Sequence, residues 1–406
     1  MNGCRSLEGF IPEFDATVVT RVLEEGGEIV GKATCENLCY SGSGLSNAYG
    51  PVINPYNSKH TAGGSSSGCG VLVAIGEADM AVACDQGGSI RNPASHCGIV
   101  GLKPTWGLVP YTGMCAFEPS LDHAGPMARN VEDCALLLEV IAGFDYGLDG
   151  RQPSFGFEVT EYSKQARKAR ELKIGVIQES FGFCTDEVKD TITEALKRIK
   201  RSKQFKEVTE FSLPHHPFAT DVATVLNLFS VSNLIDNAGT IPYSNGLQCS
   251  RLAKAMFEGL KSDSASLSHD LKIGSMLSAY LREKYGLSLL AKAENFRKEN
   301  RKRYDEALQI FDLLLTPTMN STAFALPGPE SSLEEEIDQN ISTTQNRIPF
   351  NNSGHPALTL NAGFSPITGL PIGIQIIGKR WCDATVLQAA YCIEKIFAYH
   401  GVKQQF

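Results

Sequence analysis

Hydrophobic and polar positions in the first ninety residues alternate between a helical and an extended period. Residues 15–27 carry apolar side chains at helical spacing, with Asp15 as the expected N-cap. Residues 28–34 (EIVGKAT) form a short apolar run that is typical of a buried strand. The pattern then predicts a helix over 68–78 and a strand over Met80–Cys84, with a polar, glycine-rich loop before this second pair.

The rest of the chain continues the alternation. Helices are predicted over 129–143, 186–200 and 383–397, and strands over 172–178, 205–211, 311–317, 356–364 and 370–379. The stretch 214–311 is mainly helical and has no clear strand. This order predicts an α/β fold in which helices cover both faces of a mixed β-sheet. We expect a single domain over residues 1–406, with 214–311 as a helical region within it.

Composition narrows the classes of function. The 406 residues are 42% apolar and 20% charged, with a formal net charge of −8. That balance argues against a nucleic-acid-binding surface. No apolar run approaches the roughly 18 residues that a membrane span needs. The 12 cysteines include no C-x-x-C pair, so we expect reduced thiols and a cytoplasmic protein.

The sequence does not support a nucleotide-binding loop, a nucleophile elbow or a metal site. Residues Gly26–Ala33 (GGEIVGKA) match a phosphate-binding loop, but Ala33 has no hydroxyl for magnesium and the intervening positions are apolar. The sequence around Ser66 matches G-x-S-x-G, yet no strand is predicted before it, as a nucleophile elbow requires. The histidines show no metal-ligand spacing. We therefore expect neither a metal nor a cofactor.

Two glycine- and serine-rich loops lie at the ends of one predicted helix–strand unit. About eleven helical residues rise roughly 16 Å, and about five strand residues run roughly the same distance back. Ser65 and Ser89 can therefore meet, and Lys32 would lie near them at the end of its predicted strand. A serine needs a neighbouring base to become a nucleophile, and a lysine base must be buried to lose its proton. The alternative is that Lys32 lies on the surface and the serines only make the loops flexible.

Longer motifs resemble the amidase signature family of serine hydrolases. They are VGKATCENLCYSGSG, AGGSSSGCGV and ACDQGGSIRNPASHCGIVGLKPTWGLVPYTG, supported by LDHAGPMARNVEDCALLLEVIAG, LLLTPT and the segment from HPALTLNAG to GLPIGIQIIGK. The resemblance extends over nearly the whole chain and is most specific between residues 26 and 143. Within the family, the motifs are most similar to nitrile-pathway amidases. The resemblance implies a mixed sheet sandwiched by helices.

The resemblance also implies a Ser–cis-Ser–Lys triad. The nucleophile falls on Ser89, the bridging serine on Ser65 and the base on Lys32, with a cis peptide between Gly64 and Ser65. Family members carry a further N-terminal region before the point where this chain begins, so an N-terminal portion is expected to be missing.

Backbone N–H groups of the loop before the nucleophile would form an oxyanion hole, which places it on Gln86, Gly87 and Gly88. Asp85 and Arg91 would hold this loop in place.

The implied activity is hydrolysis of a small apolar or aromatic primary amide to a carboxylic acid and ammonia, through an acyl-Ser89 intermediate. Two alternatives remain: a subunit that supplies ammonia from glutamine within an amidotransferase complex, and a truncated, catalytically silent relative. A homodimer is compatible with the family. We expect the substrate pocket to draw on residues 214–311 and on the loop from Tyr111 to Phe117.

Overall fold

The structure is a computed structural model, and it describes residues 2–154, 156–157, 159–168, 170–240, 245–328, 331–335, 337 and 344–398. Within these residues the chain forms an eight-stranded sheet in the order β1-β3-β2-β7-β8-β6-β4-β5. The strands are β1 (Met80–Cys84), β2 (Val100–Lys103), β3 (Ala124–Ala128), β4 (Lys173–Ile177), β5 (Glu207–Phe211), β6 (Leu313–Pro317), β7 (Ala357–Phe364) and β8 (Pro371–Gly378). Strand β4 is parallel to β5 and β6, and the remaining pairs are antiparallel.

Helices cover both faces of this mixed sheet, which confirms the predicted fold class. On one face, α4 (Val131–Ile141), α6 (Asp186–Ser202) and α13 (Asp383–Phe397) enclose the largest apolar cluster of the protein. Successive strand residues alternate between faces, because side chains of a strand point to opposite sides. Thus Leu313 and Leu315 belong to this cluster, whereas Leu314 packs on the other face with an aromatic cluster.

The second face carries four helices and the functional loops. These helices are α2 (Ser67–Ile75), α3 (Arg91–His96), α10 (Ser288–Ile310) and α12 (Ile348–Ser353). Helix α3 contacts β2, β7 and β8, and α12 contacts α10. Tyr304 of α10 and Phe350 of α12 pack with their ring centroids 5.1 Å apart. Helix α3 therefore packs on the sheet, and α10 and α12, from the last third of the chain, lie on the same face.

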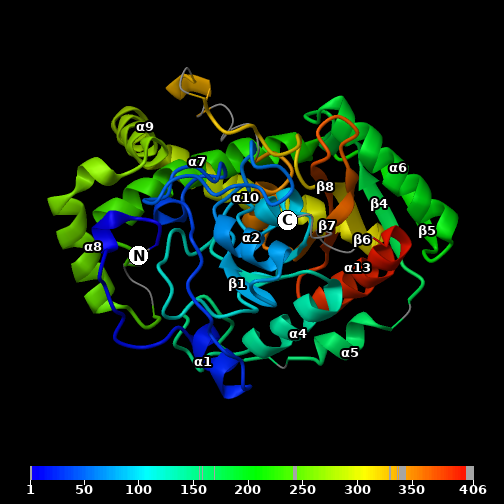
Figure 1. Cartoon of the computed structure of the whole chain (residues 1–406), viewed down its shortest axis with the longest axis horizontal. Helices are drawn as coiled ribbons and strands as arrows, with labels where there is room; N and C mark the ends of the chain where they lie inside the picture. The colour runs from blue at the N-terminus through cyan, green and yellow to red at the C-terminus, as the bar shows by residue number, and fades with distance from the viewer. Residues whose placement is uncertain are drawn as a thin grey trace.

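A helical region follows β5, as the sequence pattern predicts. It comprises α7 (His215–Asp236), α8 (Ser250–Ser262), α9 (His269–Tyr285) and α10. Figure 1 shows α8 and α9 at the end of the molecule opposite to β5. Helix α7 is long and apolar enough to cross a membrane by length and composition, contrary to our expectation. Half of its apolar window is buried, however, and α7 packs against α9, α10 and α12, as a core helix does.

The strand predicted over residues 28–34 is not present. This segment pairs with no strand, and its apolar residues Ile29 and Val30 are 46% and 74% exposed. A short apolar run is compatible with a buried strand, but it forms one only where a neighbouring strand is available to pair with it. Likewise, α1 (Thr17–Glu24) has Ala16 rather than Asp15 at its N-cap.

The sequence pattern also missed β2, β3, α3, α5 (Tyr162–Ala166) and α12. Strands β2 and β3 contain glycine, and β3 also contains proline, residues that are depleted in strands. The three helices have six residues or fewer, too short for a clear helical period.

Helix α2 and strand β1 form the predicted return of the chain. Gly76 ends α2 in the left-handed conformation, at a φ of 84°. Strand β1 then runs back and pairs with β3. The backbone N–H of Ser66 donates to the carbonyl of Ser89 over 3.3 Å, so the two serine loops meet as the lengths of helix and strand indicated.

Candidate active site

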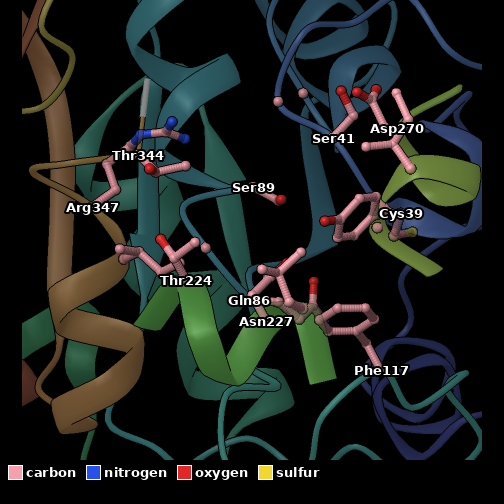
Figure 2. Close-up of a pocket in the computed structure, with 18 of the residues that line it drawn as sticks. Cys39, Ser41, Gln86, Ser89, Phe117, Thr224, Asn227, Asp270, Thr344 and Arg347 are labelled. Atoms are coloured by element: carbon pink, nitrogen blue, oxygen red, sulfur yellow. The ribbon is translucent and has the colours of Figure 1, made fainter. Parts of the chain in front are cut away.

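The Ser89 loop (residues 85–90) connects the end of β1 to the start of α3. Gly88 has a φ of 117°, a conformation that a residue with a side chain rarely adopts. Ser89 is 8% exposed and lines a cavity of about 220 Å³. Figure 2 shows its hydroxyl pointing into this cavity, between Thr224 and Thr344 on one side and Ser41 and Asp270 on the other. The turn therefore presents the Ser89 hydroxyl to the cavity.

A buried ion pair holds the Ser89 loop. Arg91 donates from Nε to Asp85 Oδ2 over 3.0 Å and from Nη2 to Asp85 Oδ1 over 2.9 Å, and both side chains are fully buried. Burial alone would raise the pKa of Asp85, but the charge and hydrogen bonds of Arg91 outweigh it and hold that pKa below its ordinary range. Asp85 is therefore a carboxylate around which the loop folds.

Two distant segments, α12 with its N-cap Arg347 and strand β8, complete the shell around Arg91. Its Nη1 donates to the carbonyl of Arg347 over 2.8 Å and to Gln375 Oε1 over 2.6 Å. Its Nη2 also donates to Asn351 Oδ1 over 2.7 Å, and Asn351 in turn donates to the Asp85 carboxylate over 2.8 Å. The two residues expected to hold the loop thus do so together with partners that the sequence did not reveal.

Backbone N–H groups of the Ser89 loop divide into two sets. Asp85 accepts from the N–H of Gly88 over 2.7 Å and from the N–H of Ile90 over 3.1 Å. The prediction that the N–H of Gly88 contributes to the oxyanion hole is therefore wrong, because that N–H already donates to the Asp85 carboxylate. Within the described residues, the N–H groups of Gln86, Gly87 and Ser89 have no protein acceptor. These three remain candidates for the oxyanion hole.

The Ser65 loop (residues 63–66) packs directly against the Ser89 loop. The Gly64–Ser65 peptide is cis, as the resemblance implied. Ser66 donates its hydroxyl to the carbonyl of Cys84 over 3.2 Å, and Ser67 donates to the carbonyl of Ser65 over 3.5 Å. The hydroxyl of Ser65 is buried and meets no hydrogen-bond partner in the described part of the chain. Of the three consecutive serines, Ser65 is the one whose hydroxyl is left for chemistry.

A buried carboxylate shapes the loop that frames Ser65. Glu36 is 1% exposed, and its carboxylate accepts hydrogen bonds from Ser43 Oγ over 3.2 Å, from the N–H of Ser46 over 2.7 Å, and from the N–H of Gly44. Its own N–H donates to the carbonyl of Ser65 over 3.1 Å. Sequence reasoning missed Glu36, because a lone glutamate in a polar loop has no pattern to mark it as buried.

Lys32 does not meet the condition set for a base. It lies on the unpaired segment 28–34, its side chain is exposed, and it does not line the cavity. The expectation that Lys32 lies buried beside the two serines is therefore wrong, because the strand that would have carried it inward does not form. No lysine lines the cavity among the residues that the structure describes.

Lys103, at the end of β2, is a lysine whose pKa is strongly affected by burial. It is fully buried, and its Nζ donates to the carbonyl of His355 over 2.6 Å and to that of Pro104 over 3.1 Å. Burial, followed by the charge of Arg91, lowers the pKa of Lys103 well below its ordinary value. Its hydrogen bonds tie β2 to the segment before β7, which is a structural role.

Replacement of Lys103 with methionine gives a prediction about pH. The unfolded chain keeps this lysine protonated up to about pH 10, whereas the folded protein releases the proton at lower pH, so the unfolded state binds more protons. The stability of the wild type relative to Lys103→Met should therefore increase as the pH rises from about 7 to about 10. Urea unfolding of both proteins at the two pH values measures it. A difference that stays constant over this range would contradict the assigned direction.

The cavity has one largely apolar wall and one polar side. Its apolar residues include Phe117, Leu228, Ile273, Leu277 and Ile348. Helices α7 and α9 supply much of this wall, as expected for residues 214–311. Polar contributions come from segments spread along the chain: Ser41, Gln86, Thr224, Asn227, Asp270, Thr344 and Arg347. The cavity suits a compact molecule that has an apolar body and a polar group directed at Ser89.

A buried guanidinium lies directly behind the Ser89 loop. Arg347 is 2% exposed, and its Nη1 donates to the carbonyl of Gly88 over 3.3 Å. Burial, together with the nearby charge of Arg91, lowers the pKa of Arg347 to about 9.

The described residues contain no cluster of three or more side chains that could hold a metal ion.

Comparisons with known proteins show which family this chain resembles. The family model described as Amidase matches residues 1–387. An enantioselective amidase of Rhodococcus rhodochrous is 38% identical over 405 residues, covering 96% of this chain and 75% of the relative. A glutamyl-tRNA(Gln) amidotransferase subunit of Exiguobacterium sibiricum is 36% identical, covering 97% of this chain and 79% of the relative.

Solved structures share the same architecture. The corresponding glutamyl-tRNA(Gln) amidotransferase subunit of Thermotoga maritima superposes with a TM-score of 0.77 and 31% identity, covering 97% of this chain and 79% of the other. A bacterial aryl acylamidase superposes with a TM-score of 0.82 at 24% identity, covering 98% and 79%, which shows a common fold. From the match over residues 1–387 and the two joined serine loops, the chain belongs to the amidase signature family.

Proposed function

We propose that the protein hydrolyses a small primary amide with an apolar or aromatic body, releasing ammonia and a carboxylic acid. One observation carries the proposal: the Ser89 hydroxyl points into a largely apolar cavity, beside the loop that holds the buried, unengaged hydroxyl of Ser65. A nucleophile next to a second hydroxyl and unused backbone N–H groups is an arrangement suited to acyl transfer.

In the proposed reaction, Ser89 Oγ attacks the amide carbonyl and its proton moves toward the hydroxyl of Ser65. The negative charge that develops on the carbonyl oxygen is stabilised by the N–H groups of Gly87 and Ser89, which no protein acceptor engages in the described chain. The C–N bond then breaks as the Ser65 hydroxyl passes its own proton to the leaving nitrogen and keeps the proton from Ser89, so that the nitrogen departs as ammonia. A water molecule hydrolyses the acyl-Ser89 ester, which releases the acid and restores the serine.

Ammonia release from a panel of aliphatic and aromatic primary amides tests this function. Wild type should release ammonia, and Ser89→Ala should release none above background. Ser66→Ala is the matched control, because the Ser66 hydroxyl is directed at the carbonyl of Cys84 rather than into the cavity. It should retain turnover and should still be labelled on Ser89 by a fluorophosphonate. Equal turnover by wild type and Ser89→Ala would refute the assignment of the nucleophile.

A second candidate function is the supply of ammonia from glutamine within a complex. It is favoured by relatives of 34–36% identity that are named as subunits of the glutamyl-tRNA(Gln) amidotransferase. The same assay separates the two candidates. A protein that hydrolyses simple amides alone supports the first. A well-folded protein that is labelled on Ser89, yet releases ammonia only from glutamine and only with a co-purified partner, supports the second.

A further inference from the structure

Asp122 links two walls of the cavity without lining it. It lies in the loop before β3 and is 1% exposed. Its carboxylate accepts the backbone N–H of Phe117 over 3.1 Å and that of Glu118 over 3.2 Å. The phenyl ring of Phe117 belongs to the apolar wall of the cavity. Asp122 therefore determines where this aromatic side chain leaves the backbone.

The same carboxylate reaches the Ser89 loop through Gln86. The side chain of Gln86 lies beside Asp122 and favours its ionised form, and the Nε2 of Gln86 donates to the hydroxyl of Tyr111 over 2.7 Å. Gln86 lines the cavity and comes three residues before Ser89 in the chain. Its amide is thus held by Tyr111 and faces the Asp122 carboxylate. The carboxylate contacts both the substrate wall and the loop that carries the proposed nucleophile.

Among the described residues, the charged groups near Asp122 are one arginine, Arg151, and one glutamate, Glu118. Arg151 donates from Nη1 to the carbonyl of Asp122 over 2.7 Å, but its guanidinium also pairs with Asp149. The carboxylate of Glu118 lies nearby on the same loop and is held by Ser120 and Ser230. The remaining titratable neighbours are neutral at neutral pH, because burial raises the pKa of Tyr111, Cys84 and Cys115 and lowers that of His123.

These surroundings let Asp122 change its charge in the neutral range. Burial is the largest influence and raises the pKa of Asp122 to about 7, although Arg151 acts in the opposite direction. A carboxylate can accept from the N–H groups of Phe117 and Glu118 together and attracts the adjacent Gln86 amide, whereas a protonated carboxyl presents a donor to one of these groups. Protonation therefore breaks part of the link between the two walls.

We propose that ionised Asp122 is a positioning residue for the hydrolysis, and that it sets the Ser89 loop and the aromatic wall together through Gln86 and Phe117. The inference rests on the proposed function. It means that turnover rises as Asp122 loses its proton, independently of the protonation of the groups that react.

The test compares Asp122→Asn with Glu118→Gln by measuring kcat and KM between about pH 5.5 and about pH 8.5. In wild type, kcat/KM should rise through an inflection near the pKa of Asp122. Asp122→Asn should lower kcat/KM by about tenfold at high pH and remove that inflection, because an amide NH₂ would face the donors of Phe117 or Gln86. Glu118→Gln removes a neighbouring negative charge, so the inflection should shift to lower pH while the plateau stays the same.

The outcomes separate this inference from the proposed function. Failure of wild type to release ammonia from any amide would overturn both. An active wild type whose pH profile is unchanged in Asp122→Asn, and unshifted in Glu118→Gln, would overturn the role of Asp122 alone. Should Asp122→Asn fail to fold, Glu118→Gln and Tyr111→Phe still decide. Tyr111→Phe removes the hydroxyl that holds Gln86 and should lower kcat with the inflection retained, whereas loss of the inflection would overturn its assignment to Asp122.

Discussion

Replacement of Arg91 with methionine is expected to lower the free energy of unfolding by about 3–5 kcal/mol. The variant leaves the carboxylate of Asp85 buried without its counter-charge, and removing one partner of a buried pair costs far more than the pair contributes. The Arg347 carbonyl and the side-chain oxygens of Gln375 and Asn351 also lose their donor. Urea unfolding followed by circular dichroism measures the change.

An exposed ion pair provides the control for this experiment. Arg167 pairs with Glu132 over 2.9 Å, and their side chains are 63% and 39% exposed. Solvent screens such a pair, so Arg167→Met should change stability by less than about 1 kcal/mol. The double variant Asp85→Asn/Arg91→Met should recover part of the loss, since no buried charge remains. If Arg91→Met and Arg167→Met were equally mild, the Asp85–Arg91 pair would not be what holds the Ser89 loop.

A methyl group at Gly88 is expected to reduce kcat by at least about 100-fold, the size of effect seen when oxyanion stabilisation is lost. A Cβ on Gly88 would lie 2.5 Å from Arg347 Nη1, 2.7 Å from its Cδ and 2.8 Å from its Cβ. The φ of 117° adds backbone strain for any residue other than glycine. Gly88→Ala must therefore rotate the loop and move the N–H groups of Gly87 and Ser89. Single-turnover ammonia release measures the effect on the chemical step.

Gly87 is the matched comparison for Gly88. A Cβ there would meet Ile348 Cδ1 at 3.5 Å and Cγ1 at 3.7 Å, which is ordinary van der Waals contact. The loss of kcat in Gly88→Ala should therefore exceed the loss in Gly87→Ala by at least about tenfold, that is, by about 1.4 kcal/mol in activation free energy. Equal losses in the two variants would show that steric contact with Arg347 does not control the loop.

Much of the architecture was predictable because it depends on local periodicity. The strand Met80–Cys84 appears with the predicted bounds, and the helical region after β5 and the convergence of the two serine loops also follow from the pattern. Each of these features depends on residues that are close in the chain. A helix and a strand of matched length must return to their origin, whatever lies around them.

The features that were missed depend on partners far away in the sequence. Residues 28–34 have the composition of a buried strand, but burial requires a neighbouring strand that a local pattern does not reveal. Lys32 was placed beside the serines on that assumption and is exposed instead. Gly88 was expected to donate to an oxyanion, yet its N–H is used by a carboxylate three residues earlier. Only the folded arrangement shows which donors are already engaged.

The shell around Arg91 has a consequence for the order in which the protein matures. Ser65 and Ser89 are synthesised early, but Arg91 contacts Gln375, 284 residues later in the chain. Contacts of such long sequence separation form late, because the entropy of closing the loop must be overcome first. A nascent chain that does not yet include β8 has both serines but lacks Gln375, one of the partners that fix the guanidinium. The Ser89 loop therefore reaches its folded arrangement only after β8 has been synthesised and has docked against Arg91.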